Sequence, residues 1–151
     1  MANTQAMATS FKTELLSGIH ALGTTVIRAG TGADTFKAAL YLTTATLDAS
    51  TTAYSASNEV SGSNYVAGGI TVTNATAPTS SGTTAYWTPS ANLTYTPVTR
   101  ATAFDAVLIY NSTQSNKAVS VHTFGSQTIS AGTFTLTMPT SDATNALIRI
   151  A

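Results

Sequence analysis

Residues 104–110 read FDAVLIY and form the most apolar run in the chain. The polar stretch NSTQSNK follows at residues 111–117, and KAVSVHTF then restores an apolar pattern at residues 117–124. A short apolar run bounded by turn signals is typical of a strand that is covered on both faces. We therefore predict a β-hairpin here, with residues 104–110 as its largely covered first strand.

The segments on either side of this hairpin carry further strand signals. Residues 36–42 alternate between an apolar inner face and a second face, and residues 133–138 alternate threonine with Phe, Leu and Met. Alternation of this kind predicts a half-buried strand. Shorter strands are predicted at residues 24–29, from Ile70 onwards, at residues 92–98 and at residues 146–150.

Two segments rich in small polar residues interrupt the strand signals. Residues 73–84 contain Pro, Gly and Ser, and this composition predicts a loop. Residues 43–58 are rich in Ser, Thr and Ala, and they fit either a short helix or an irregular loop.

The one convincing helical pattern lies near the N-terminus. Phe11, Leu15 and Ile19 recur at a spacing of four residues and so fall on one helical face. This spacing predicts a short helix within residues 10–22, with Ser10 as a candidate N-cap.

The predicted elements define a mainly β chain with a single domain. The chain has 151 residues, which suits one domain with a proper core. Its 31 threonines favour β structure, because threonine is β-branched and packs well on a pleated sheet. We predict a β-sandwich or barrel of about eight to ten short strands with one short N-terminal helix. Residues 1–9 are predicted to be a flexible or partner-held arm, and residues 10–151 a single β-rich domain.

Charge and composition exclude several classes of function. Six Lys and Arg residues balance six Asp and Glu residues, and only 8% of the residues are charged. The cations are scattered singly, so we expect no basic face for nucleic acid. Without cysteine, the chain has neither disulfides nor thiolate metal sites. It also lacks the long apolar run of a membrane-spanning helix, so we expect no membrane partner. A nearly neutral surface suits a protein that is held in an assembly.

The motifs for catalysis, cofactors and metals are incomplete. The stretch NEVSGSNYVAGG at residues 58–69 lacks the lysine and following Ser or Thr of a phosphate loop, so its glycines are interpreted as turn residues. His20 and His122 share no local motif that would hold a metal. Asp105 has three open interpretations: it orients His122, pairs with Arg100 or caps a turn. We predict no enzyme activity and no catalytic, cofactor-binding or metal-binding residues.

Aromatic residues give the only candidates for a binding surface. Tyr and Trp residues in the middle of the chain either form a binding stripe or fill the core, and the core is favoured. Tyr65 and Trp87 stand out because loop signals flank both. Together with Glu59, they are the predicted partner contacts.

The order of four segments resembles a known protein family. They are SFKTELLSGIHAL (residues 10–22), the stretch from DTFKAALYL to NYVAGG (34–69), FDAVLIYNSTQSNKAVSVHTFG (104–125) and GTFTLTMPTSDATNALIRIA (132–151). In this order they resemble a family of small virion structural proteins of tailed bacteriophages. Its members share an FK-ELL-G-H helix, an EV-G--Y-AGG loop and an A-LIYN strand. The resemblance covers most of the chain, except residues 73–98.

The resemblance implies that the protein is part of a virion. It identifies no catalytic or other functional residues. The first hypothesis is a capsid decoration, or cement, protein that braces major capsid subunits on the head surface. The chain would be made in the host bacterial cytoplasm and act as a homo-oligomer, with a trimer favoured. The alternative is a low-copy neck, tail or fibre-base component that binds other virion proteins. A third hypothesis is a carbohydrate-binding module or small hydrolase.

Overall fold

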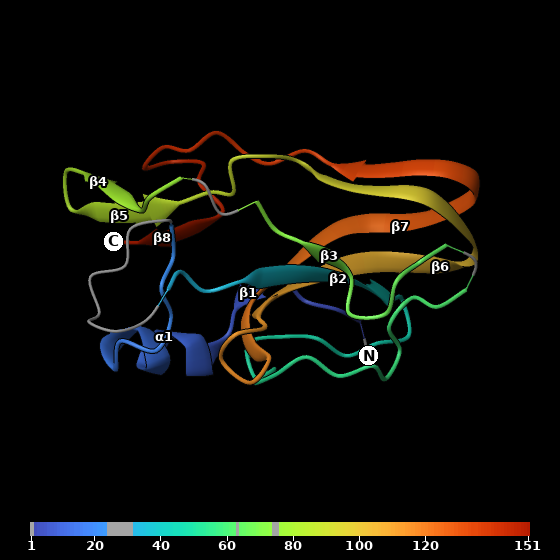
Figure 1. The fold of residues 1–151 in the computed structure, drawn as a ribbon, viewed down its shortest axis with the longest axis horizontal. Helices are drawn as coiled ribbons and strands as arrows, with labels where there is room; N and C mark the ends of the chain where they lie inside the picture. Colours follow the sequence, from blue (N-terminus) through green and yellow to red (C-terminus); the bar gives the residue numbers. More distant parts are fainter. Residues whose placement is uncertain (1, 24–31, 63, 74–75) are drawn as a thin grey trace.

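The computed structural model describes residues 2–23, 32–62, 64–73 and 76–151 (Figure 1). Along the chain these contain β1 (Ala6–Met7), α1 (Thr9–Leu16), β2 (Phe36–Leu42), β3 (Ile70–Thr71), β4 (Thr79–Ser81), β5 (Thr84–Trp87), β6 (Leu93–Asn111), β7 (Lys117–Leu136) and β8 (Ile148–Ile150). The strand predicted at residues 24–29 lies outside the described residues.

The strands form two antiparallel sheets. The larger has the order β1-β7-β6-β2-β3 and the smaller the order β4-β5-β8, so each sheet has two open edges. The prediction of a mainly β fold with one short helix is confirmed. The strands are not uniformly short, however, because β6 and β7 contain 19 and 20 residues.

The long β6–β7 hairpin folds back over itself. Figure 1 shows the first part of β6 and the last part of β7 turning at one end of the molecule to lie above their other halves. The register between β6 and β7 shifts repeatedly between Tyr95 and Ala106, and such irregularities bend and twist a strand. The upper layer is held to β2 by the Tyr95 hydroxyl, which donates to the Ala38 carbonyl at 2.9 Å. One hairpin therefore supplies both layers of a sandwich-like core.

The apolar run that opens the hairpin lies at the centre of the large sheet. In β6, Leu108 pairs with Ala39 of β2 on one side and with Val121 of β7 on the other. All three side chains are fully buried. The predicted covered strand at residues 104–110 is therefore confirmed. Between the layers, the Phe104 ring packs edge-on against Phe134 with ring centroids 5.0 Å apart.

The N-terminal residues pack against the chain instead of extending as the predicted arm. Ala6 and Met7 pair with β7, which makes β1 an edge strand of the large sheet. Asn3 is buried, and its Oδ1 accepts from the Leu47 amide at 3.0 Å while its Nδ2 donates to Asp105 at 2.6 Å. A polar side chain with both ends satisfied can be buried, and polarity alone therefore gave the wrong prediction. Asn3 is also a partner of Asp105 that the three interpretations of this carboxylate did not include.

The helix is shorter than its apolar pattern predicted. It ends at Leu16, and Gly18 adopts a φ of +69° just beyond it, as expected for a residue that terminates a helix. The N-cap residue is Ala8, with no side-chain capping hydrogen bond, so Ser10 does not have the predicted capping role.

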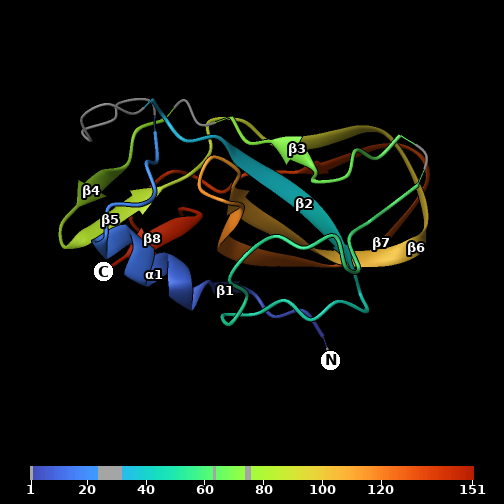
Figure 2. The same ribbon diagram turned by 60° about the horizontal axis from the view of Figure 1, so that its bottom comes forward.

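Two loop predictions have different outcomes. Residues 43–58 contain turns and one isolated bridge, at Ala53, but no helix or strand, and the irregular-loop alternative is the one observed. The predicted loop at residues 73–84 is interrupted by β4, which pairs with β5 across a turn at Gly82. Figure 2 shows this hairpin beside β8 and near α1. Loop-type residues hid the hairpin because β4 is fully exposed and has no apolar face.

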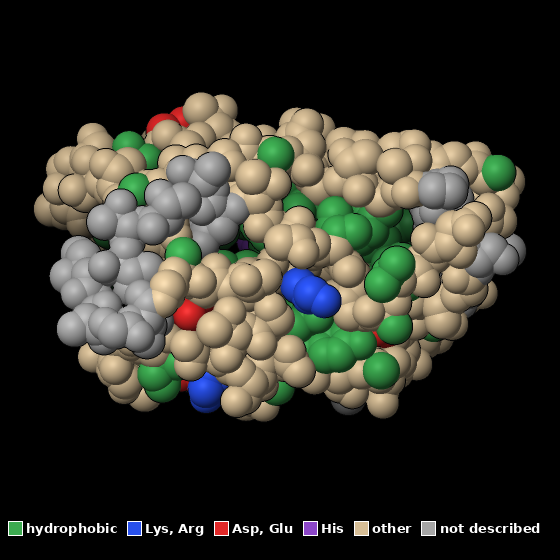
Figure 3. Space-filling model, in the orientation of Figure 1, with side chains coloured by type: hydrophobic (Ala, Val, Ile, Leu, Met, Phe, Trp, Pro, Cys, Tyr) green, Lys and Arg blue, Asp and Glu red, His purple; other side chains and the backbone are tan. Residues whose placement is uncertain are grey.

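The surface is polar but poor in charge. Figure 3 shows isolated Lys, Arg, Asp and Glu side chains on a face that is otherwise mostly uncharged. Among the residues that the structure describes, no helix has the length and apolarity needed to cross a membrane.

Candidate functional site

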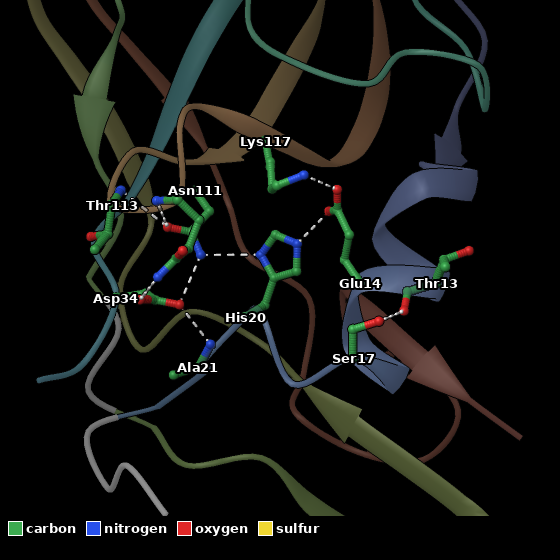
Figure 4. Close-up of polar contacts among 10 residues, drawn as sticks. Thr13, Glu14, Ser17, His20, Ala21, Asp34, Asn111, Thr113 and Lys117 are labelled. Atoms are coloured by element: carbon green, nitrogen blue, oxygen red, sulfur yellow. Dashed lines mark hydrogen bonds and ion pairs between the residues drawn. The ribbon is translucent and has the colours of Figure 1, made fainter. Parts of the chain in front are cut away.

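A buried polar cluster connects α1 to the turn between β6 and β7 (Figure 4). The His20 cluster consists of Glu14, His20, Asp34, Asn111 and Lys117. The imidazole of His20 is fully buried, with Nε2 2.7 Å from Glu14 Oε2 and Nδ1 3.1 Å from Asn111 Nδ2. The Lys117 ammonium group donates to the other carboxylate oxygen of Glu14. The imidazole thereby joins Glu14 of α1 to Asn111 of β6, and Glu14 in turn contacts Lys117 of β7.

The Asp34 carboxylate completes the far side of the His20 cluster. Its Oδ2 accepts from Asn111 Nδ2 at 2.9 Å and from the Ala21 amide at 2.7 Å. The side-chain oxygen of Asn111, Oδ1, accepts hydrogen bonds from two backbone amides of the β6–β7 turn, those of Thr113 and Gln114. Asn111 therefore shapes the turn with one end of its amide and holds His20 and Asp34 with the other.

The arrangement around His20 favours a structural role over proton transfer. A neutral imidazole with its proton on Nε2 donates to Glu14 and accepts from Asn111, and this tautomer is assigned from the hydrogen-bond pattern. In a catalytic triad, the nitrogen opposite the carboxylate faces a nucleophile. Here that nitrogen faces the amide group of Asn111, which has no nucleophilic role. The cluster instead fixes α1 against the sheet.

Acid is expected to weaken this connection through Glu14. Burial raises the pKa of Glu14, but hydrogen bonds from Lys117 and His20 together outweigh it and hold the pKa below its usual value. Since the folded pKa is depressed, the stabilisation is fully present above the pKa of an unfolded glutamate and is lost as pH falls through the folded pKa. We expect Glu14→Gln to cost about 1–3 kcal/mol at pH 7 and to lose less stability in acid than wild type.

Urea unfolding of wild type and Glu14→Gln between pH 7 and pH 3 measures this difference. Lys12→Gln is the matched control, because it also changes one charge on α1 and lies on an exposed position. If the stability gap between wild type and Glu14→Gln stays constant across this range, the ionised Glu14 carboxylate does not hold α1.

A second buried carboxylate organises the stretch at residues 58–69. The Glu59 cluster consists of Tyr54, Glu59, Tyr65 and Gly68. Glu59 accepts from the Tyr54 hydroxyl at 2.6 Å, from the Tyr65 hydroxyl at 2.9 Å and from the Gly68 amide at 2.7 Å. The Tyr65 oxygen also accepts from the Leu40 amide at 2.9 Å. Burial raises the pKa of both tyrosine hydroxyls, and the Glu59 charge raises them further, so both remain donors near neutral pH.

The glycines of this stretch have a structural role, as predicted. Gly68 and Gly69 adopt φ values of +85° and +72°, and the Val60 amide donates to the Leu40 carbonyl at 2.8 Å. The stretch thus closes over β2. The Gly68 amide points at Glu59 inside the chain, where no phosphate has access.

Removing the Glu59 carboxylate is expected to destabilise the protein strongly. Glu59→Ala leaves two hydroxyls and one amide without their acceptor, and each unsatisfied buried donor costs about 1–3 kcal/mol. We expect a loss of about 3 kcal/mol or more in the free energy of unfolding, measured by urea denaturation. Tyr54→Phe removes one hydroxyl from this cluster and should cost only about 1 kcal/mol. Equal losses in the two variants would mean that Glu59 does not organise the stretch.

The predicted partner contacts lie largely inside the chain. Glu59 and Tyr65 come together in the Glu59 cluster, whereas Trp87 lies apart in β5. The Trp87 ring is 1% exposed, packs near Phe36 and donates from Nε1 to the Thr76 carbonyl at 2.9 Å. It offers a partner almost no surface, although the loop signals on both sides of it predicted a partner contact. Pairing with β4 and β8 on both sides makes β5 an interior strand.

Of the three predicted contacts, Tyr65 comes nearest to the surface. It borders a small hollow of about 100 Å³ together with Tyr95, Ile70 and Val66, and Val66 is 70% exposed. Figure 3 shows hydrophobic side chains gathered in a hollow between β3 and the first part of β6. A role for Tyr65 in partner contact therefore stays a prediction.

Within residues 2–23, 32–62, 64–73 and 76–151, no three His, Asp or Glu side chains gather where they would hold a metal ion. No family model matches the chain, and comparisons with curated proteins and with solved structures found no significant match.

Proposed function

We propose that this protein is a structural component of a tailed-bacteriophage virion and that it decorates the head by bracing neighbouring major capsid subunits. The virion assignment rests on the ordered motifs that resemble the phage family. The structure adds one supporting observation. The FK-ELL-G-H and A-LIYN motifs meet in the His20 cluster, and the EV-G--Y-AGG motif supplies most of the Glu59 cluster.

This observation favours a scaffold over a reaction centre. Motif residues far apart in the sequence fix a helix, a loop and a turn to one sheet, with their donors and acceptors directed inward. A protein that braces a lattice must keep its shape under load, and such fixed loops provide that rigidity. The proposed role requires a rigid surface that contacts capsid subunits, and it does not require a cleft.

The proposed mechanism is linkage between decoration and capsid stability. A protein that binds the assembled lattice but not free capsid subunits stabilises the lattice by mass action. Low surface charge lets many copies lie close together with little repulsion. The favoured assembly is a trimer, because closed symmetry presents the same surface to equivalent capsid sites.

The carbohydrate-binding alternative is less well supported. It needs an aromatic platform open to solvent, and Trp87, its principal candidate, is 1% exposed. The low-copy neck, tail or fibre-base alternative differs from head decoration in copy number, and the same experiment distinguishes them.

Copy number per particle tests the proposal. Virions of the phage that encodes this chain would be purified, and the chain quantified on a gel against the major capsid protein. Head decoration predicts copies in a fixed ratio to the capsid protein across the whole head. A copy number that fits a single ring at the neck or tail would support the alternative. Absence of the chain from purified particles would overturn the virion role.

A further inference from the structure

A polar cavity lies where the N-terminal strand, β7 and the C-terminal segment meet. Its volume is about 450 Å³, within the range of about 300–1,000 Å³ that is typical of small-molecule sites. Gln5 and Met7 line it from the β1 segment, His122 from β7, and Asn145, Leu147 and Arg149 from the C-terminal segment. Neither the His20 cluster nor the Glu59 cluster contributes to it.

Arg149 is the one charged side chain among the described residues that line this cavity. Among the described residues, no carboxylate lies within ion-pair distance of its guanidinium group, which makes no hydrogen bond. On the same segment, the Asp142 carboxylate accepts from the Thr144 and Asn145 amides and from the Asn145 side chain. These hydrogen bonds lower the pKa of Asp142 and the Arg149 charge lowers it further, but the two side chains form no ion pair. A guanidinium group presents a planar fork that matches a carboxylate. Arg149 is therefore available to an anion that enters the cavity.

His122 adds a neutral polar group to the wall. Burial lowers the pKa of His122 to about 4, so its imidazole is uncharged at neutral pH. Its Nε2 lies 2.8 Å from the Ser120 hydroxyl, and its Nδ1 has no hydrogen-bond partner in the part of the chain that the structure describes. When the Ser120 hydroxyl donates to Nε2, the Nδ1 proton is free to donate to an oxygen of a ligand.

Part of the remaining wall is apolar, beside the polar side chains of Gln5 and Asn145. Met7 and Leu147 are partly buried and pack against the core, and Pro139 lines the same cavity. We propose that the cavity binds a small ligand that carries one carboxylate and one apolar group. The carboxylate pairs with Arg149 and His122, and the apolar group contacts Met7 and Leu147. One lining cation suits a single negative charge better than a doubly charged phosphate.

N-acetyl-L-leucine is the probe for this site, and its uncharged amide, N-acetyl-L-leucinamide, is the matched ligand control. Titration of the full chain, followed by amide and imidazole NMR signals, should give saturable shifts at Gln5, His122 and Leu147 with the acid. We expect at least about tenfold weaker binding for the amide and for the acid added to Arg149→Gln, since both lose the ion pair. Lys12→Gln, which removes a cation on α1, should bind like wild type.

The ligand has two sources, a free acid or the C-terminal end of another polypeptide. A short peptide that ends in leucine separates them: binding of the peptide identifies a chain end, and binding of only N-acetyl-L-leucine identifies a free acid. Equal binding of the acid and its amide would overturn the proposal. So would unchanged affinity in folded Arg149→Gln, or the absence of saturable shifts with either probe. The virion role does not depend on any of these outcomes.

Discussion

Gly69→Ala should prevent stable folding, or lower the free energy of unfolding by more than about 4 kcal/mol. A Cβ atom at position 69 would lie 1.8 Å from the Ala38 carbonyl oxygen and 2.5 Å from its carbon. Both atoms belong to the backbone of β2, a strand that pairs on both sides and cannot move aside. The φ of +72° adds a penalty of about 1 kcal/mol for any residue with a Cβ. Circular dichroism and urea denaturation measure the loss.

Gly82→Ala is the matched control for this substitution. Gly82 also has a positive φ, +58°, but a Cβ there would meet no atom within 4 Å. Its cost should stay near the conformational penalty of about 1 kcal/mol. If Gly69→Ala and Gly82→Ala lose the same stability, the stretch at residues 58–69 does not lie against β2 as closely as described.

The strands at residues 36–42 and 104–110 were predictable because local pattern and tertiary role agree there. Apolar runs and alternation are local signals, and both segments lie in the middle of the large sheet. The length of β6 and β7 was not predictable in this way. Their register shifts and their folding over β2 depend on packing between layers, which leaves no fixed period in the sequence.

The two buried clusters also depend on contacts between distant segments, which the sequence alone does not predict. His20 and Asn111 are 91 positions apart, and the spacing of His, Asp and Glu residues gives no sign that they meet. Glu14 and Glu59 are both buried, and hydrogen bonds within its cluster hold each of them. The partners of Glu14 are His20 and Lys117, and those of Glu59 are two tyrosines and a backbone amide. No catalytic or metal-binding spacing in the sequence pairs these residues.

Contacts with distant segments explain the main errors of the sequence predictions. Asn3 and the residues after it were assigned to an arm because they are small and polar, yet three hydrogen bonds hold the Asn3 side chain inside. The sequence before Trp87 was interpreted as a loop because strand β4 contains only exposed residues of types that are common in loops. In both places the decisive contact comes from a distant segment, and a local pattern cannot report it.

Leu108→Asp is the second substitution with a very large expected effect, and it should unfold the domain. Leu108 is fully buried, and β2 and β7 flank it on both sides within the sheet. An unpaired carboxylate there loses its hydration without a compensating partner, at a cost of several kcal/mol that adds to the lost apolar contacts. Total stability of a domain this size is about 5–15 kcal/mol, so one such charge suffices to unfold it.

Leu108→Met and Gln127→Asp separate charge from position. Leu108→Met keeps the volume and apolar character of the side chain and should cost less than about 1.5 kcal/mol. Gln127→Asp introduces the same carboxylate at an exposed position of β7, where a change within about 0.5 kcal/mol is expected. Far-ultraviolet circular dichroism and the dispersion of amide NMR signals distinguish folded from unfolded variants. A soluble Leu108→Asp protein with an unchanged melting temperature would mean that the centre of the core lies elsewhere than β6.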